Sequence, residues 1–236
     1  PAVAEATPPG LSGSFRLSIG GLLVGRAALA TEAGGGRYRI TLEGEAAGLV
    51  ARFRSGRVEA VTEGMLGPDG PVPGAFRIAF IDTRTPREVS VRYGPAGPEV
   101  TAEPGFDPRP WQIAPSGQAD ALDPLSALLA AFAPGPRAGL CDRTFAVFDG
   151  RRRYAVRVDP AEPRSDLGTV GCAVEIRRSA GFKPKMRAKP PVRLRATFEA
   201  WRDGLWRLRR LVGETALGAA VLARDCPRRG CRNGRR

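Results

Sequence analysis

The chain has 236 residues, 42% hydrophobic and 26% charged, with a formal net charge of +13, a composition typical of a folded globular protein rather than a disordered chain. This length suits one large all-β domain or two small ones, and no apolar run approaches the roughly 18 residues that span a bilayer. Histidine is absent, so the commonest general base and transition-metal ligand are missing, which disfavours hydrolytic and metal-dependent chemistry.

The chain begins with PAVAEATPPG and has no initiating Met. A start rich in small residues and proline is typical of a mature exported protein from which a signal peptide has been removed. Residues 1–10 show no periodicity, so we expect a flexible N-terminal arm. The even number of cysteines, four, favours an oxidising compartment.

Alternation of polar and apolar residues at period two predicts strands through most of the N-terminal half. With Gly-rich turns between them, these strands form an antiparallel meander. The predicted strands are residues 14–19, 22–31, 37–43, two short strands within 49–62, then 75–80, 88–93 and 99–102. Residues 103–120 contain four prolines and are expected to form a long crossing loop. Trp111 is expected to anchor this loop to the body of the protein, with stacking on a ligand as the alternative.

One buried helix is predicted over residues 123–133. Asp123 is placed to cap its N-terminus, and Pro124 takes the first helical position, where its missing N–H costs nothing. The large apolar side chains share one stripe at helical spacing: Leu125, Leu128, Leu129 and Phe132. The Pro-Gly-Pro sequence at 134–136 ends the helix.

After the helix, predicted strands at 144–148 and 153–158 flank Asp149-Gly150, a dipeptide favoured in tight hairpin turns. Further strands are predicted at residues 170–176, 192–198, 206–211 and 215–222. About a dozen strands with one helix exclude a parallel βαβ order. We therefore predict an all-β domain over residues 11–224: one curled antiparallel sheet, an incomplete barrel or β-spiral, around a buried plug helix. Residues 225–236 are expected to be a basic tail.

Three features together resemble the family known as domain of unknown function 3108, over roughly residues 12–224. They are a β-rich first half that begins with a Gly-punctuated strand pair, the DPLSALLA helix, and the FAVFDGRRRY hairpin between Cys141 and Cys172. The resemblance implies a periplasmic protein similar in architecture to lipoprotein carriers and curled-sheet envelope proteins of Gram-negative bacteria. It also implies an apolar ligand or a protein partner, and no known reaction. The Leu205-Trp206-Arg207 segment and the Cys226/Cys231 tail depart from the family pattern.

The cysteines are interpreted as structural. Cys141 and Cys172 flank the hairpin, so we expect a disulfide between neighbouring strands, stabilising by roughly 3–4 kcal/mol. Cys226 and Cys231 form a second candidate pair that would close a small exposed loop. The C-x2-C knuckles of a four-cysteine zinc site and the C-x-x-C of a redox pair are both missing, so neither a metal nor a cofactor is expected.

No residue set in the sequence amounts to an active site. Asp123 and Ser126 are explained by a helix cap, and Ser126 has neither a His nor a suitably placed Lys to activate it. Asp142 and Asp149 are candidate paired carboxylates, but the hairpin turn explains Asp149. We therefore expect a protein that is not an enzyme.

The positive charge is concentrated near the C-terminus: from Arg177 onward there are 18 Lys and Arg against 4 Asp and Glu. Such asymmetry points to an anionic partner, although a solvated basic face with a disordered tail explains it too. The candidate surface site, called here the basic patch, comprises Arg151, Arg152, Arg177, Arg178, Lys183, Lys185, Arg187 and Lys189. Lipid headgroups fit it, since basic residues near an anionic surface add about 1 kcal/mol each. Nucleic acid is disfavoured because Phe182 is the one aromatic residue close by in the sequence.

These patterns predict a non-enzymatic periplasmic protein of the cell envelope that binds a lipid or an apolar peptide segment in the concave face of its sheet. The expected ligand-binding residues are the helical Leu125, Leu128, Leu129 and Phe132, together with Trp111. The alternative is a periplasmic scaffold that recognises a protein or an anionic glycan through its basic C-terminal third.

Overall fold

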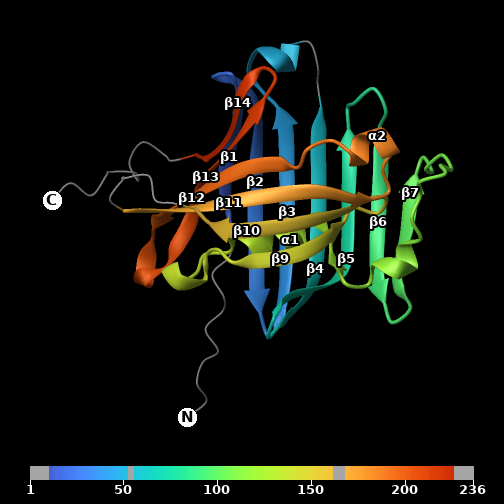
Figure 1. The fold of residues 1–236 in the computed structure, drawn as a ribbon, viewed down its shortest axis with the longest axis horizontal. Coiled ribbons are helices and arrows are strands. Elements are labelled where there is room, and N and C mark those ends of the chain that lie inside the picture. Colours follow the sequence, from blue (N-terminus) through green and yellow to red (C-terminus); the bar gives the residue numbers. More distant parts are fainter. Residues whose placement is uncertain (1–10, 53–55, 162–167, 226–236) are drawn as a thin grey trace.

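A computed structural model describes residues 11–52, 56–161 and 168–225. The first seven strands are β1 (Gly13–Ile19), β2 (Leu22–Gly34), β3 (Arg37–Ala46), β4 (Arg57–Gly67), β5 (Gly70–Ile81), β6 (Arg87–Gly94) and β7 (Gly97–Glu103). The second seven are β8 (Ala121–Leu122), β9 (Arg143–Phe148), β10 (Arg153–Pro160), β11 (Thr169–Ala180), β12 (Val192–Ala200), β13 (Trp206–Thr215) and β14 (Gly218–Arg224). These fourteen strands of the described residues form one sheet (Figure 1).

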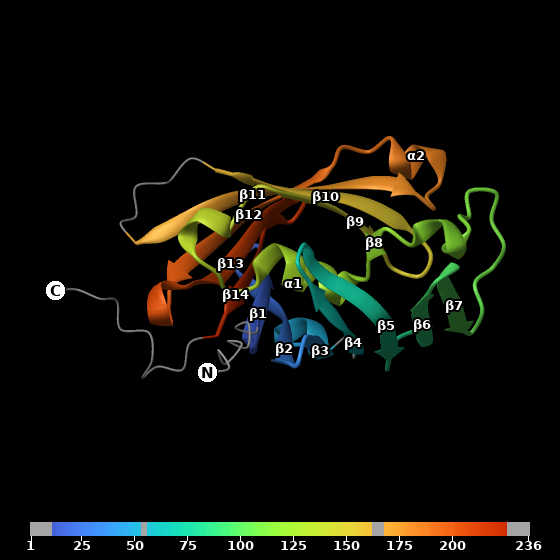
Figure 2. The same ribbon diagram turned by 90° about the horizontal axis from the view of Figure 1, so that it is seen from below.

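The sheet is curled but not closed. Its strand order is β7-β6-β5-β4-β3-β2-β1-β14-β13-β12-β11-β10-β9-β8, so β7 and β8 stand at opposite ends of the order. The β1–β14 pair joins the two halves of the chain, and Figure 2 shows these halves facing each other as two layers. The predicted all-β class and curled, incomplete-barrel architecture are confirmed.

Helix α1 (Pro124–Phe132) lies between the two layers (Figure 2). As predicted, Asp123 caps it: one carboxylate oxygen accepts hydrogen bonds from the backbone N–H groups of Leu125 and Ser126, at 2.9 and 3.0 Å. Leu125, Leu129 and Phe132 are buried, and the Phe132 ring lies 6.4 Å from that of Phe198 on β12. Because layers cover it on both sides, α1 buries the small residues Ser126, Ala127 and Ala131 as well as Leu125 and Leu129.

The predicted disulfide between Cys141 and Cys172 is present, with the two Cα atoms 5.8 Å apart. Cys172 is fully buried in β11. The disulfide therefore attaches the segment between α1 and β9, which contains Cys141, to β11. Cys226 and Cys231, like residues 1–10 and most of the basic tail, lie outside the described residues.

Three local predictions were wrong. Within 49–62, the first predicted strand is instead the 3-10 helix η1 (Gly48–Arg52), because Gly48 takes a left-handed conformation (φ +66°) that ends β3. The basic loop 183–189 contains a one-turn helix, α2 (Pro184–Arg187), which Pro184 begins. The last hairpin turns later than predicted, at Thr215–Gly218, where the Thr215 hydroxyl donates to the Gly218 carbonyl.

The sheet contains one parallel pair of strands, although the predicted order of about a dozen strands and one helix had excluded a parallel βαβ order. β8 and β9 run parallel over two residue pairs, Ala121 with Ala146 and Leu122 with Val147. Helix α1 connects these two strands, so the segment is a short β-α-β crossover at the edge of an otherwise antiparallel sheet. No helix within the described ranges is long and apolar enough to cross a membrane.

Candidate functional site

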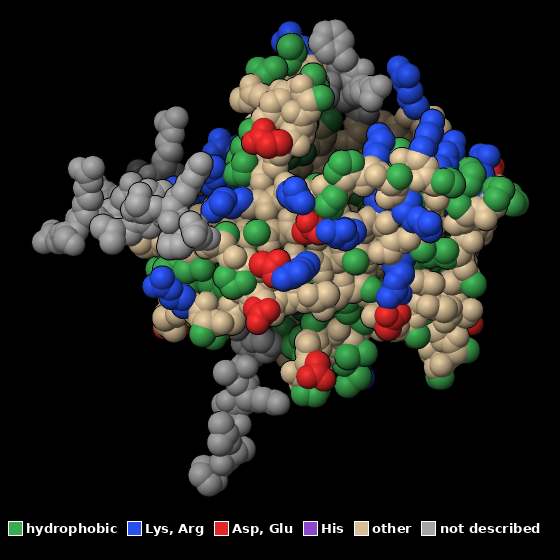
Figure 3. Space-filling view, in the orientation of Figure 1, with side chains coloured by type: hydrophobic (Ala, Val, Ile, Leu, Met, Phe, Trp, Pro, Cys, Tyr) green, Lys and Arg blue, Asp and Glu red, His purple; other side chains and the backbone are tan. Residues whose placement is uncertain are grey.

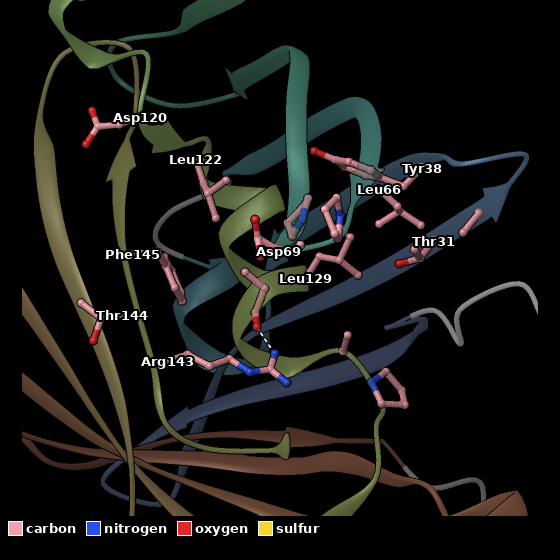
Figure 4. A pocket seen from close by; sticks show the side chains of 17 residues that line it. Thr31, Tyr38, Leu66, Asp69, Asp120, Leu122, Leu129, Arg143, Thr144 and Phe145 are labelled. Atoms are coloured by element: carbon pink, nitrogen blue, oxygen red, sulfur yellow. Dashed lines mark hydrogen bonds between the residues drawn. The ribbon is translucent and has the colours of Figure 1, made fainter. Parts of the chain in front are cut away.

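A pocket of about 620 Å³ lies beside α1, between β9 in one layer and the ends of β2 to β5 in the other (Figure 4). Its wall is largely apolar: Tyr38, Leu66, Leu122, Leu129 and Phe145. Pro68 and Asp69, both exposed in the β4–β5 turn, also line it. The volume falls within the range of roughly 300–1,000 Å³ usual for small-molecule sites.

Arg143 is the cation of this pocket (Figure 4). The half-buried guanidinium donates hydrogen bonds to the carbonyl oxygens of Ala130, at the end of α1, and Gly139. This contact suits a helix C-terminus, where a positive charge opposes the helix dipole. Burial lowers the pKa of Arg143. No carboxylate of the described residues forms an ion pair with it, whereas Asp120, which also lines the pocket, is paired with Arg153 at 2.5 Å.

Behind the pocket, a buried polar network holds the start of α1 against β3 and β4. The hydroxyls of Ser126 and Thr62 donate to one carboxylate oxygen of Asp123, the Thr62 bond measuring 2.9 Å. The hydroxyls of Tyr38 and Ser126 share a hydrogen bond of 2.6 Å. Burial raises the pKa of Asp123, and it raises that of Tyr38 to about 12. The network positions the helix, and it has no histidine or lysine to act as a base.

The other candidate carboxylates do not come together. Asp149 accepts hydrogen bonds from the backbone N–H groups of Arg151 and Arg152, at 2.9 and 2.7 Å, so it stabilises the β9–β10 turn. Asp142 precedes β9 at its other end, where its own N–H donates to the Val158 carbonyl at 2.7 Å. Among the described residues there is also no group of three or more acidic, Cys or His side chains able to hold a metal ion.

Three members of the basic patch lie over aromatic rings. Arg152 stacks on Phe182 at 5.4 Å from guanidinium carbon to ring centroid, and Lys183 lies 5.5 Å from the centre of the Trp111 ring. Arg151 stacks on Phe106 at 4.9 Å. The crossing loop, the β9–β10 turn and the segment before α2 therefore meet at one place, which the sequence did not reveal.

Like charges lie close together around Arg151. Burial and neighbouring cations, Arg152, Arg87 and Arg109, lower the pKa of Arg151.

The other members of the patch are spread over α2 and β11. Lys185, Arg187 and Lys189 are exposed on and after α2, Arg178 donates to the Pro190 carbonyl at 3.1 Å, and Glu175 neutralises Arg177 at 2.6 Å. Figure 3 shows Lys and Arg side chains gathered around α2.

The sequence model of a family described as "Protein of unknown function (DUF3108)" matches residues 14–193. The chain belongs to the DUF3108 family. The predicted resemblance is thereby confirmed. No curated protein matches the sequence.

The fold of this DUF3108 protein is similar to that of a β-barrel-like protein of the domain of unknown function DUF1849 from Brucella abortus, known from a crystal structure. The two share a TM-score of 0.51 over 92% of this chain and 97% of that chain, with 12% sequence identity. At this identity the similarity concerns the fold alone.

Of the five residues that the sequence suggested for an apolar ligand, Leu129 lines the pocket of this DUF3108 protein. Leu125 and Phe132 belong to the packed core, Leu128 is half-buried against that core, and Trp111 lies under Lys183 on the crossing loop. The sequence analysis missed Arg143, because its contact with the Ala130 carbonyl is made 13 residues away along the chain and has no local signal.

Proposed function

We propose that this DUF3108 protein is a non-enzymatic, periplasmic protein of the cell envelope that holds an apolar chain in the pocket beside α1. The observation that carries the proposal is the pairing of an apolar wall with Arg143, a half-buried cation that has no carboxylate partner among the described residues. Ligand sites are typically apolar with a few polar groups that fix orientation. The Cys141–Cys172 disulfide supports an oxidising compartment.

A lipid with an anionic head fits this pocket better than an apolar peptide segment. Arg143 uses two of its five N–H groups on backbone carbonyls, which leaves others to donate to a carboxylate or phosphate. An apolar peptide segment would leave this charge without a counterion. The bound chain would lie along Leu129 and Phe145, between α1 and β9.

Uptake of a fluorescent long-chain fatty acid by the purified protein tests this proposal, with native mass spectrometry to measure stoichiometry. We expect one molecule per chain. The substitution Leu66→Trp should block binding, because this half-buried side chain faces the pocket. Val192→Trp is the matched control, since Val192 is 41% exposed and does not line the pocket. No uptake by the unmodified protein, or equal uptake by both variants, would contradict the proposal.

A second candidate function rests on the basic patch: recognition of an anionic macromolecule by a periplasmic scaffold. Its support is the stacking of Arg151, Arg152 and Lys183 on aromatic rings, which holds cations in fixed positions at the surface. Charge reversal at Lys183, Lys185 and Arg187 should abolish capture of such a partner and leave fatty-acid uptake unchanged. Loss of both activities would indicate a folding defect instead, which thermal unfolding detects.

A further inference from the structure

The three most exposed large apolar side chains of the described residues are leucines in or beside the connections between strands. Leu217, in the β13–β14 turn, is 79% exposed, Leu22, after the β1–β2 turn, 67%, and Leu49, in η1, 60%. Single exposed leucines need no explanation, but several at one place mark an interaction surface.

The β1–β2 turn and the start of β2 contact both of the other segments. The Gly20 N–H donates to the Ala219 carbonyl at 3.0 Å, which joins the β1–β2 turn to the β13–β14 turn. The Ala47 N–H donates to the Val24 carbonyl at 3.0 Å, and a Cβ on Gly48 would lie 2.4 Å from the Leu23 carbonyl oxygen, so η1 packs on the start of β2. The leucines thus share one end of the molecule, at the top of Figure 1, and we call them the leucine tip.

The basic patch lies at the same end. In an antiparallel meander every second turn lies at the same end of the sheet. The β5–β6 turn, with exposed Arg84, and the loop after β7 therefore lie at the same end of the sheet as the leucine tip. That loop carries Phe106, on which both Arg87 and Arg151 stack, at 5.0 and 4.9 Å. Figure 3 shows apolar side chains at the top of the molecule and Lys and Arg side chains beside them over α2.

We propose that this end of the molecule docks on a bilayer that carries anionic lipids, with the leucine tip inserted at the boundary of headgroups and acyl chains and the basic patch on the headgroups. Stable attachment of peripheral proteins to a bilayer takes two signals, an apolar insertion and a basic surface, and this end supplies both. An anionic glycan would leave the leucines in water, and an apolar protein surface would leave the cations unpaired.

The docking surface is separate from the ligand pocket. The pocket is lined by the β4–β5 turn, which lies at the opposite end of the strands from the β1–β2 turn. The inference therefore goes beyond the proposed function, and each can fail without the other.

Co-sedimentation of the full chain with vesicles tests the proposal. We expect binding to vesicles of phosphatidylcholine and phosphatidylglycerol in equal parts, and much weaker binding to phosphatidylcholine alone. The triple variant Leu22→Ser/Leu49→Ser/Leu217→Ser should weaken binding at least about tenfold without changing the melting temperature, because all three side chains are exposed. The matched control is Met65→Ser/Val72→Ser, a similarly exposed pair at the opposite end, which should bind like the unmodified protein.

Charge reversal at Lys185 and Arg187 should weaken binding to the mixed vesicles and reduce its dependence on salt. The proposal is overturned by absence of binding, by equal binding to both kinds of vesicle, or by an effect of the control equal to that of the leucine variant. Binding of an anionic polysaccharide as tight as that of vesicles, with no effect of the leucine variant on either, would also overturn it and leave the scaffold function in its place.

Discussion

Thr62 and Asp123 are 61 positions apart in the sequence and are joined by a hydrogen bond of 2.9 Å between the Thr62 hydroxyl and a carboxylate oxygen of Asp123. Both residues are fully buried. The same carboxyl group caps α1 and accepts from Ser126, so one side chain links the helix to the meander. The stability of the fold should therefore depend on the Asp123 carboxyl group.

Removal of the Asp123 carboxyl group should destabilise the fold strongly. Asp123→Ala loses the helix cap, worth about 1 kcal/mol, and leaves the buried Thr62 and Ser126 hydroxyls without their acceptor, for a total of roughly 2–4 kcal/mol. Asp123→Asn keeps an oxygen for the cap and should cost less. Urea unfolding measures both free energies, and equal losses for the two variants would show that the cap contributes little.

The stability of the protein should depend on the ionisation of Asp123. Burial raises the folded-state pKa of this carboxyl group above the value of 3.8 expected in the unfolded chain. Between those two pKa values the folded state holds a proton that the unfolded state has lost, so the free energy of unfolding falls as the pH rises through this window. Tyr38, with its pKa raised to about 12, stays neutral throughout.

The measurement is the free energy of unfolding of the unmodified protein minus that of Asp123→Asn, followed as a function of pH. This difference cancels carboxylates such as Asp120, whose pKa Arg153 lowers and whose contribution has the opposite sign. It should decrease with rising pH above 3.8 and then become constant. A difference that increases with pH would mean that the network stabilises the charged carboxylate.

Arg143 should determine which headgroup the pocket accepts. Arg143→Gln is expected to weaken binding of a long-chain fatty acid by about ten- to a hundredfold, because a charge-assisted hydrogen bond contributes roughly 1.5–3 kcal/mol. Binding of the fatty alcohol of equal length should change little, and Arg143→Lys should retain part of the preference. If alcohol and acid are affected equally, Arg143 acts through the end of α1, where it donates to the Ala130 carbonyl, and not on the ligand.

Loss of the disulfide should lower stability without changing the fold. The double variant Cys141→Ala/Cys172→Ala opens a loop with a sequence separation of 31 residues. The chain-entropy model gives a loss of roughly 3–4 kcal/mol, measured by urea unfolding. The double substitution removes this bond alone and leaves the other two cysteines of the sequence, Cys226 and Cys231, unchanged. A loss below about 1 kcal/mol would show that the reduced chain keeps this loop ordered when unfolded.

The β9–β10 turn should tolerate no side chain at Gly150. This residue has φ +91°, and a Cβ there would lie 2.7 Å from a methyl group of Val89 on β6. Gly150→Ala should therefore cost about 1–3 kcal/mol and loosen the contact between the turn and the opposite layer. Gly117→Ala, where a Cβ meets nothing within 4 Å, is the control and should be nearly neutral.

The sequence contained much of the fold because period-two alternation is a local signal. Strands such as β3 and the Asp123-Pro124 start of α1 follow from neighbouring residues alone. The Cys141–Cys172 pair, 31 residues apart, was predictable because the two cysteines flank a hairpin that is itself a local signal. The short parallel pair of β8 and β9 did not, since two residues carry no period.

The candidate site was harder to predict because it is assembled across the two layers. Helical spacing identifies Leu125 and Leu129 as one stripe, but which of them faces the pocket depends on strands distant in sequence. Likewise, Phe106 and Arg151 meet only after the crossing loop returns to the β9–β10 turn. Residue type alone gives no signal for such contacts.

An open sheet has a mechanical consequence. In a closed barrel the number of strands and their stagger fix the radius, so the interior can be resized only by changing the whole ring. Here β7 and β8 are free of that constraint, and α1 acts as a wedge that sets the gap between the layers. Trimming or enlarging a single side chain of the wedge, such as Leu129, can therefore retune the interior volume while every strand keeps its register.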